Sequence, residues 1–237
     1  MKMKRHYRLF LACAFFGLLA TTISSCSNDE DAVEPVREGI KRSELILTEI
    51  TGESVEAHGD HFHGLDAGTE GDPVVISFNE KGDAVENGHL HLEADAAYKV
   101  ELKYWDYNDK EMQNEITASK TNADQYKAFL IGGDFVLNPD SQTQSGAIFQ
   151  PRESTYGDGT AVDGKYEVTG ILSYFTVGQD NQGATKQVTY VLRKLNGDIK
   201  GKIERTDWNR DDYEATFSGE NVLELTFEIH AEAGHIH

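Results

Sequence analysis

The sequence is poor in cysteine, and this shortage excludes two kinds of stabilisation. Its 237 residues contain Cys13 and Cys26, and Cys13 falls inside an apolar N-terminal leader. Removal of the leader leaves one cysteine, so a disulfide within the mature chain is excluded. The remaining single thiol cannot build a copper(I) thiolate site or an iron–sulfur cluster either. Stability must come from a packed core, which a chain of this length can form.

Basic residues are also scarce, since 22 Lys and Arg stand against 41 Asp and Glu, for a formal net charge of −19. Four of the basic residues lie in the leader, which has no acid, so the rest of the chain is more acidic still. Such a surface repels nucleic-acid phosphates and anionic lipids and attracts cations. We therefore expect no nucleic-acid partner. Solubility alone would also account for the charge.

Residues 1–25 have the features of a bacterial secretion signal. Lys2, Lys4, Arg5 and Arg8 form the charged start, and residues 9–20 form an apolar stretch too short for a stable membrane span. The end of the leader, Thr22-Ile23-Ser24-Ser25-Cys26, resembles a lipobox in which Ile replaces the commoner Leu. This implies cleavage before Cys26 and lipid attachment to it. The alternative is an ordinary secreted protein with an incidental cysteine.

An acidic run, Ser27-Asn28-Asp29-Glu30-Asp31, directly follows Cys26. It resembles the surface-export signal of lipoproteins of the Bacteroidota, and implies an outer-membrane lipoprotein exposed at the cell surface. Residues 26–42 are polar, contain Pro35 and lack apolar periodicity, so we expect them to form a flexible acidic tether.

Residues 43–237 have the sequence pattern of a β domain: short runs of alternating apolar and polar residues, separated by Gly, Asn and Asp. The clearest predicted strands cover residues 45–50, 74–78, 89–93, 98–104, 187–195 and 222–230. Residues 123–131 fit a strand or a short helix, and 164–177 form a long β-rich run expected to pair with 187–195. These runs predict an all-β fold, an antiparallel β-sandwich (immunoglobulin-like or related) with long loops, of which residues 138–165 are the longest.

Parts of the predicted domain look like segments of small, largely uncharacterised lipoproteins of the Bacteroidota, which have sandwich-like domains. The segments that carry this resemblance are residues 123–130, 170–177, 190–193 and 227–230. The resemblance implies compartment and fold, and it transfers no catalytic residue.

Eight of the nine histidines lie in three clusters, each with a His-x-His motif. The clusters are His58, His61 and His63 with Asp60; His89 and His91 with Glu93; and His230, His235 and His237 near the C-terminus. Residues i and i+2 of a strand face the same way, so His-x-His presents two imidazoles side by side. Zinc takes about four ligands, so two such pairs, or a pair with a carboxylate, fill its shell.

We therefore expect one shared metal site. A flexible 58–63 loop would join the strand pair His89 and His91, with Asp60 or Glu93 as oxygen ligand or hydrogen-bond partner. The C-terminal histidines would complete the site or act as a collecting arm. The alternatives without a metal site are a solvated loop at 58–63, an exposed histidine pair at 89 and 91, and a disordered tail at 235–237.

The predicted function is binding of a divalent transition metal without catalysis, for capture or for delivery to an outer-membrane importer. Zinc is the leading ion, and copper(II) or nickel also suit imidazole and carboxylate ligands. Haem capture by two axial histidines is one alternative. Another is an adhesin or glycan-binding module, in which Trp105, Trp208 and surface tyrosines stack on sugars. A catalytic zinc would need an open coordination position and a cleft.

Overall fold

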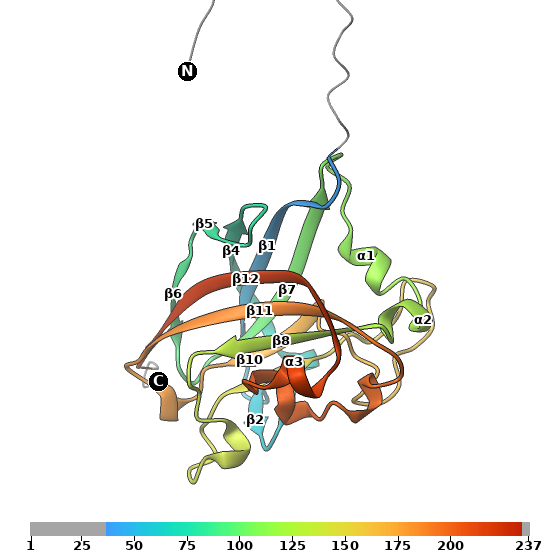
Figure 1. Ribbon diagram of the computed structural model, residues 1–237. Coiled ribbons are helices and arrows are strands. Elements are labelled where there is room, and N and C mark those ends of the chain that lie inside the picture. The colour runs from blue at the N-terminus through green and yellow to red at the C-terminus, as the bar shows by residue number, and fades with distance from the viewer. Residues whose placement is uncertain (1–36, 234–237) are drawn as a thin grey trace, which may run out of the picture. The chain divides into compact units, whose positions relative to one another are not determined.

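The fold is all-β, as the sequence predicts: two mainly antiparallel sheets pack face to face in a sandwich-like arrangement (Figure 1). The computed structural model describes residues 37–233. The predicted signal peptide, the predicted lipidation site Cys26, most of the predicted tether, and His235 and His237 lie outside these residues. Within them, no helix is long and apolar enough to span a membrane.

The larger sheet has six strands in the order β5-β4-β1-β7-β10-β9. Their bounds are β5 Ala84–Glu86, β4 Thr69–Phe78, β1 Ile40–Thr51, β7 Ala97–Asp106, β10 Leu172–Thr176 and β9 Ile148–Pro151. The smaller sheet has the order β6-β12-β11-β8, with bounds β6 His89–Glu93, β12 Gly219–Glu232, β11 Thr185–Leu195 and β8 Tyr126–Gly132. In the smaller sheet β6 runs parallel to β12, and the other neighbours pair antiparallel.

The short elements connect these strands. They are the hairpin strands β2 Glu56–His58 and β3 His61–His63, the helices α1 Gln113–Ile116, α2 Lys120–Ala123 and α3 Tyr213–Thr216, and the 3-10 turns η1 Leu65–Ala67, η2 Asn138–Asp140, η3 Gln179–Asn181, η4 Lys200–Lys202 and η5 Arg205–Asn209. The segment 123–131, predicted as strand or helix, is mainly the strand β8, which begins at Tyr126; only Ala123 belongs to a helix, α2. The predicted loop 138–165 includes η2 and β9.

The main core lies between the two sheets and follows the alternation that the sequence predicts. On β12 the side chains of Leu223, Leu225, Phe227 and Ile229 are buried, and those between them are exposed or half-buried. The buried apolar face of β1 meets this set in one cluster. Removing such faces from water is the main stabilising contribution to the fold.

Among residues 37–233, the apolar cover on the outer face of the smaller sheet lies at one end only. The chain from η4 to α3 packs Ile203, Tyr213 and Phe217 against Phe129 of β8 and Val191 of β11 (Figure 1). The outer faces of β6 and β12 are not part of this cluster, and their polar residues remain exposed or half-buried. This uncovered half carries three histidines.

The predicted pairing of the β-rich run 164–177 with 187–195 is wrong, and only the end of this run is a strand. Strand structure is confined to β10, which pairs with β7 and β9, whereas β11 pairs with β12 and β8. The reason is that side chains occupy the backbone groups of residues 167–172. The Glu153 carboxylate accepts the N–H groups of Thr169, Gly170 and Leu172 at 3.0, 2.5 and 3.3 Å.

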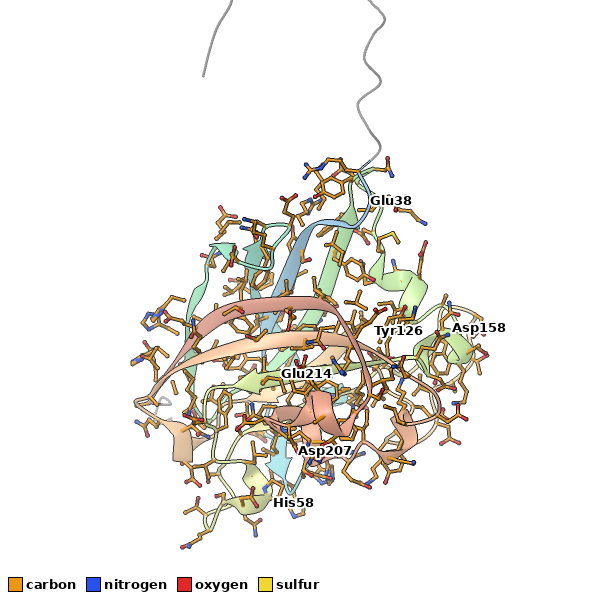
Figure 2. All side chains as sticks on the ribbon, in the orientation of Figure 1. Glu38, His58, Tyr126, Asp158, Asp207 and Glu214 are labelled. Carbon is orange, nitrogen blue, oxygen red and sulfur yellow. The ribbon has the colours of Figure 1, made fainter. Side chains whose placement is uncertain are left out.

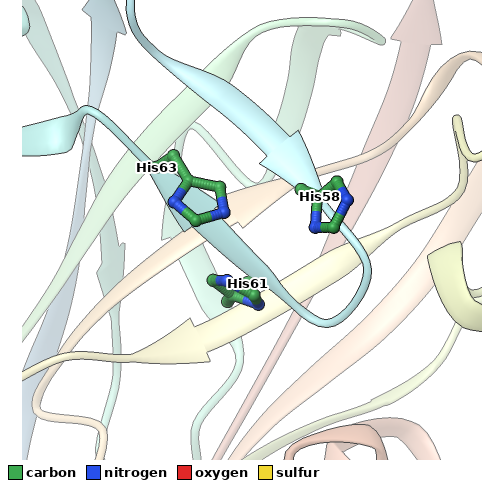
Figure 3. Close-up of side chains that lie close together, drawn as sticks. All are labelled: His58, His61 and His63. Carbon is green, nitrogen blue, oxygen red and sulfur yellow. The ribbon is translucent and has the colours of Figure 1, made fainter.

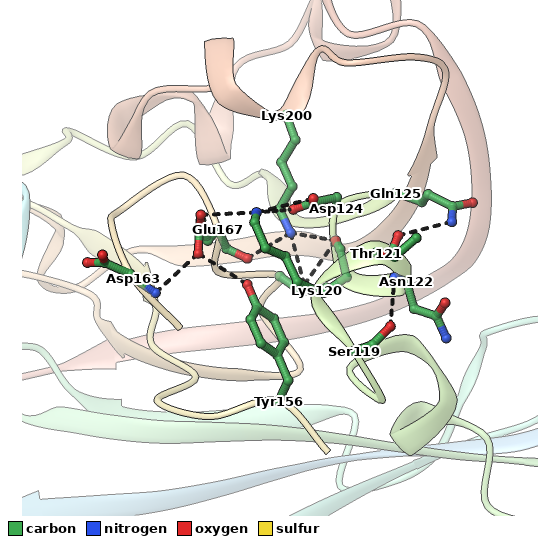
Figure 4. Close-up of polar contacts among 12 residues, drawn as sticks. Ser119, Lys120, Thr121, Asn122, Asp124, Gln125, Tyr156, Asp163, Glu167 and Lys200 are labelled. Atoms are coloured by element: carbon green, nitrogen blue, oxygen red, sulfur yellow. Dashed lines mark hydrogen bonds and ion pairs between the residues drawn. The ribbon is translucent and has the colours of Figure 1, made fainter. Parts of the chain in front are cut away.

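A buried lysine, Lys200, also holds this segment (Figure 4). The Lys200 ammonium donates to the carbonyl oxygens of Ala123 and Glu167 at 2.5 and 2.9 Å, and to Oγ1 of Thr169 at 3.1 Å. Burial, with the neighbouring charge of Lys127, lowers the pKa of Lys200 to about 7. These contacts replace strand pairing and satisfy the buried backbone groups.

Candidate metal centre

His58, His61 and His63 come together on one face of the β2–β3 hairpin, without help from the other clusters (Figure 3). His58 pairs with His61 across the hairpin, and cross-strand partners share a face. His63 lies two residues beyond His61 and so faces the same way. The predicted flexible loop at 58–63 is therefore a strand–turn–strand unit. Gly59 has φ +58°, which a glycine adopts without strain in a two-residue turn.

The opposite face of the hairpin is anchored in a core. Phe62 is 2 % exposed and packs in a cluster with Ile50, Leu65 and Ile148. Its backbone N–H donates to Oε1 of Gln150 at 2.8 Å. The turn is held as well, because Nδ2 of the buried Asn138 donates to the carbonyl of Gly59 at 2.8 Å. The three imidazoles thus stand on a fixed platform.

The spacing of the three imidazoles fits a metal ion. One ligand atom from each lies within 4.8 Å of the others, and the ring centroids are 4.6, 5.7 and 6.0 Å apart. Tetrahedral zinc holds its nitrogens about 3.3 Å apart, which places imidazole centroids about 5 Å apart. Exposed His58 and His63 can close the difference by rotating their side chains.

Asp60 orients His61 instead of joining the three histidines. Its Oδ1 lies 2.8 Å from Nδ1 of His61 and 3.3 Å from Nη1 of Arg205. Burial raises the pKa of Asp60, but the hydrogen bond with His61 and the Arg205 guanidinium outweigh it and leave the pKa below its ordinary value. With Nδ1 engaged, His61 offers Nε2 to a metal, the usual carboxylate–histidine–metal arrangement.

Glu56 is the residue that sequence reasoning missed. It pairs with His63 in the hairpin register and lies two residues before His58, so it shares the face of the three histidines. Its side chain is exposed. The signal was present, because Glu56-x-His58 has the same i, i+2 spacing as His61-x-His63, but it is visible only once β2 is recognised as a strand.

A second histidine group lies on the uncovered half of the smaller sheet. The parallel register of β6 and β12 sets His91 beside His230, and ring centroids join His89, His91 and His230 at 4.9, 5.4 and 6.4 Å. Nδ1 of His89 lies 3.0 Å from Glu228, and Nδ1 of His91 lies 2.6 Å from Glu232. Nδ1 of His230 lies 3.0 Å from Oγ1 of Thr185.

The structure does not join the two groups into the shared site expected from the sequence. Each ring contacts members of its own group, and among residues 37–233 no ring contact links the hairpin to β6 or β12. Figure 1 shows β6 at the left edge of the domain and β2 at its bottom, in a separate two-stranded sheet. Glu93 lies on β6 with the second histidine group, because it pairs with Glu232 in the β6–β12 register. The reason is that β6 joins β12, not the hairpin.

The tryptophans do not form the sugar-stacking surface of the glycan-binding alternative. Trp105 and Trp208 are 8 % and 5 % exposed. Trp208 packs against Phe135, Phe149 and Phe175 in the core. A guanidinium covers Trp105, with Cζ of Arg42 at 3.5 Å from the ring centroid.

Comparisons with protein-family models, with curated proteins and with solved structures found no match. The hairpin histidines therefore have to be interpreted through their own geometry.

Proposed function

We propose that this protein is a surface-exposed outer-membrane lipoprotein, anchored through Cys26, that binds a divalent transition metal at His58, His61 and His63. Zinc is the preferred ion, and copper or nickel are the alternatives. The role is capture of the ion or its delivery to an importer, by binding without turnover. The lipobox-like leader and the acidic run after Cys26 support the anchoring part of the proposal.

The observation that carries the metal proposal is the convergence of three imidazoles on a platform fixed by a buried phenylalanine. Three nitrogen ligands leave a fourth position, for which Glu56 is a candidate because it shares their face in the hairpin register. Asp60 supplies the hydrogen bond that fixes the ring of His61. The acidic surface adds a long-range attraction for cations.

The site lies at an end of the domain that is open to solvent. Figure 2 places His58 at the end far from Glu38, where the described chain begins. His58 and His63 are exposed, so the hairpin is accessible to an ion from solvent, which a capture function requires.

The test is metal analysis and zinc titration calorimetry of the mature protein, purified without a nickel column. The double variant His61→Ala/His63→Ala should lose tight zinc binding. The matched control is His89→Ala/His91→Ala, which removes two imidazoles at the same i, i+2 spacing from another strand and should leave the tightest zinc step intact. Absence of bound metal together with zinc affinity weaker than micromolar in the unaltered protein would overturn the proposal.

A further inference from the structure

Beside the hairpin lies a pocket of about 280 Å³ that the metal proposal does not use. It lies between β8, β9 and the η5 turn. Its charged lining residues are Lys127, Arg152, Glu153, Lys165, Glu204 and Arg205. Four cationic side chains against two acidic ones make this pocket positive in a chain whose net charge is −19. Chance placement on so acidic a surface would give the opposite sign.

The two acidic residues of the pocket are already engaged. Glu153 accepts three backbone N–H groups from residues 169–172. Glu204 accepts from Nζ of Lys165 at 2.5 Å and from the Tyr166 hydroxyl at 2.9 Å. The carboxylate oxygens of Glu153 and Glu204 can therefore accept few further hydrogen bonds from the other cations of the pocket.

Most of the N–H donors of Lys127, Arg152 and Arg205, in contrast, make no hydrogen bond within the described structure. Lys127 is 7 % exposed, and its ammonium, with three donors, makes one hydrogen bond, to the Val168 carbonyl at 3.1 Å. Arg152 has five N–H donors and makes two long contacts, 3.4 Å to the Phe62 carbonyl and 3.6 Å to the exposed Asp66. Arg205 uses one nitrogen on Asp60.

Gln150 adds a further donor. Its Oε1 accepts the Phe62 N–H, and this leaves its amide NH₂ as the group that it can offer to the pocket. A partly buried pocket with an excess of donors over acceptors is suited to a ligand that only accepts hydrogen bonds. Ionised carboxylates and phosphates are such ligands, and arginine binds both through paired N–H donors.

We propose that this pocket binds a small oxyanion, a carboxylate or a phosphate, through Lys127, Arg152 and Arg205. This site is separate from the metal proposal and stands whether or not the hairpin binds an ion. The two are physically linked, however. Arg152 and Gln150 contact the backbone of Phe62, and Arg205 contacts Asp60, so the residues that would bind the anion also hold the metal hairpin.

The test is calorimetric titration of the metal-free mature protein with inorganic phosphate and, separately, with succinate at constant ionic strength. Metal should be removed by a solid chelating resin, because soluble chelators are themselves polycarboxylates. Saturable binding of one equivalent is expected, and comparison of the two titrations identifies which chemistry the pocket prefers. Absence of saturable binding of both anions would overturn the proposal.

The variants that locate the binding are Arg152→Gln and Lys127→Met. Loss of a charge-assisted hydrogen bond should weaken anion binding by about 10-fold or more. Arg152 is partly exposed, so its variant is expected to fold even if the buried Lys127 variant does not. The matched control, Lys81→Met, removes one exposed positive charge from the β4–β5 turn and should change affinity little. Equal weakening by Arg152→Gln and Lys81→Met would show non-specific attraction and overturn the assignment.

Discussion

Nδ1 of His61 lies 2.8 Å from Oδ1 of Asp60, and the same oxygen lies 3.3 Å from Nη1 of Arg205. One carboxylate oxygen therefore fixes the orientation of an imidazole and joins the hairpin to the η5 turn. A residue that the sequence offers as a metal ligand takes the role of a positioning residue.

Changing Asp60→Asn tests this role. We expect zinc affinity to fall by about 10–100-fold, the usual cost of removing a hydrogen-bond partner behind a metal ligand. Titration calorimetry measures the change. Asp66→Asn serves as control, because its carboxylate is exposed and lies on the next turn of the chain without contacting a histidine. A loss as small as that of the control would mean that Asp60 does not orient His61 for metal binding.

Changing Glu56→Gln tests the fourth coordination position. The carboxylate faces the three histidines in the hairpin register, so its removal should weaken zinc binding by about 10-fold, the effect of losing about 1.4 kcal/mol. Glu53→Gln, at an exposed position just before β2, is the control and should leave affinity unchanged. If both variants bind as the unaltered protein does, water or another group fills the fourth position.

Changing Phe62→Ala tests the platform beneath the site. Phe62 is 2 % exposed, and truncation of a buried phenylalanine costs about 3–5 kcal/mol. We expect the free energy of unfolding in urea to fall by this amount, and zinc affinity to fall with it. Val85→Ala, at a residue that is 63 % exposed, should change stability by less than about 0.5 kcal/mol. An unchanged unfolding free energy for Phe62→Ala would contradict the anchoring of the hairpin.

The pH dependence of anion binding tests the role of Lys127. Burial lowers the pKa of Lys127 to about 8, with Glu153 raising it, Arg205 lowering it and Asp207 raising it. The ammonium is charged below this pH and loses its proton above it, so affinity should fall as the pH rises through about 8. Succinate is the suitable probe, because its carboxylates stay ionised throughout this range. Lys127→Met should remove the pH dependence, and a decline that persists in this variant would assign it to another group.

The fold was largely predictable from the sequence, because the alternation of apolar and polar residues along a strand indicates which of its faces is buried. The predicted strand 89–93 coincides with β6, and the inward residues of 222–230 are the buried residues of β12. The β-rich run 164–177 is a strand only from Leu172 to Thr176, for a reason that the local sequence pattern does not contain. Glu153 and Lys200, distant in sequence, occupy the backbone groups that a strand would pair.

The grouping of the histidines was predictable in part. His-x-His spacing correctly placed His89 and His91 on one exposed face of a strand, whereas the loop predicted for His61 and His63 is strand β3. Which clusters meet depends on strand order, and the parallel pairing of β6 with β12 brings His230 to His91 rather than bringing the hairpin there. Strand order is set by long-range packing, which one sequence without pairing information does not reveal.

The two histidine groups differ in how their formation depends on the folded chain. His91 and Glu232 are in contact across 141 positions, so the β6–β12 group exists only when the smaller sheet is assembled. The hairpin histidines are close neighbours in sequence, and a short flexible peptide can bring them onto one ion. An unfolded chain that still chelates reduces the stabilisation that the metal gives to the native state. If the hairpin binds an ion as proposed, it can do so before folding is complete. An ion bound by the histidines of β6 and β12 would require the folded sheet.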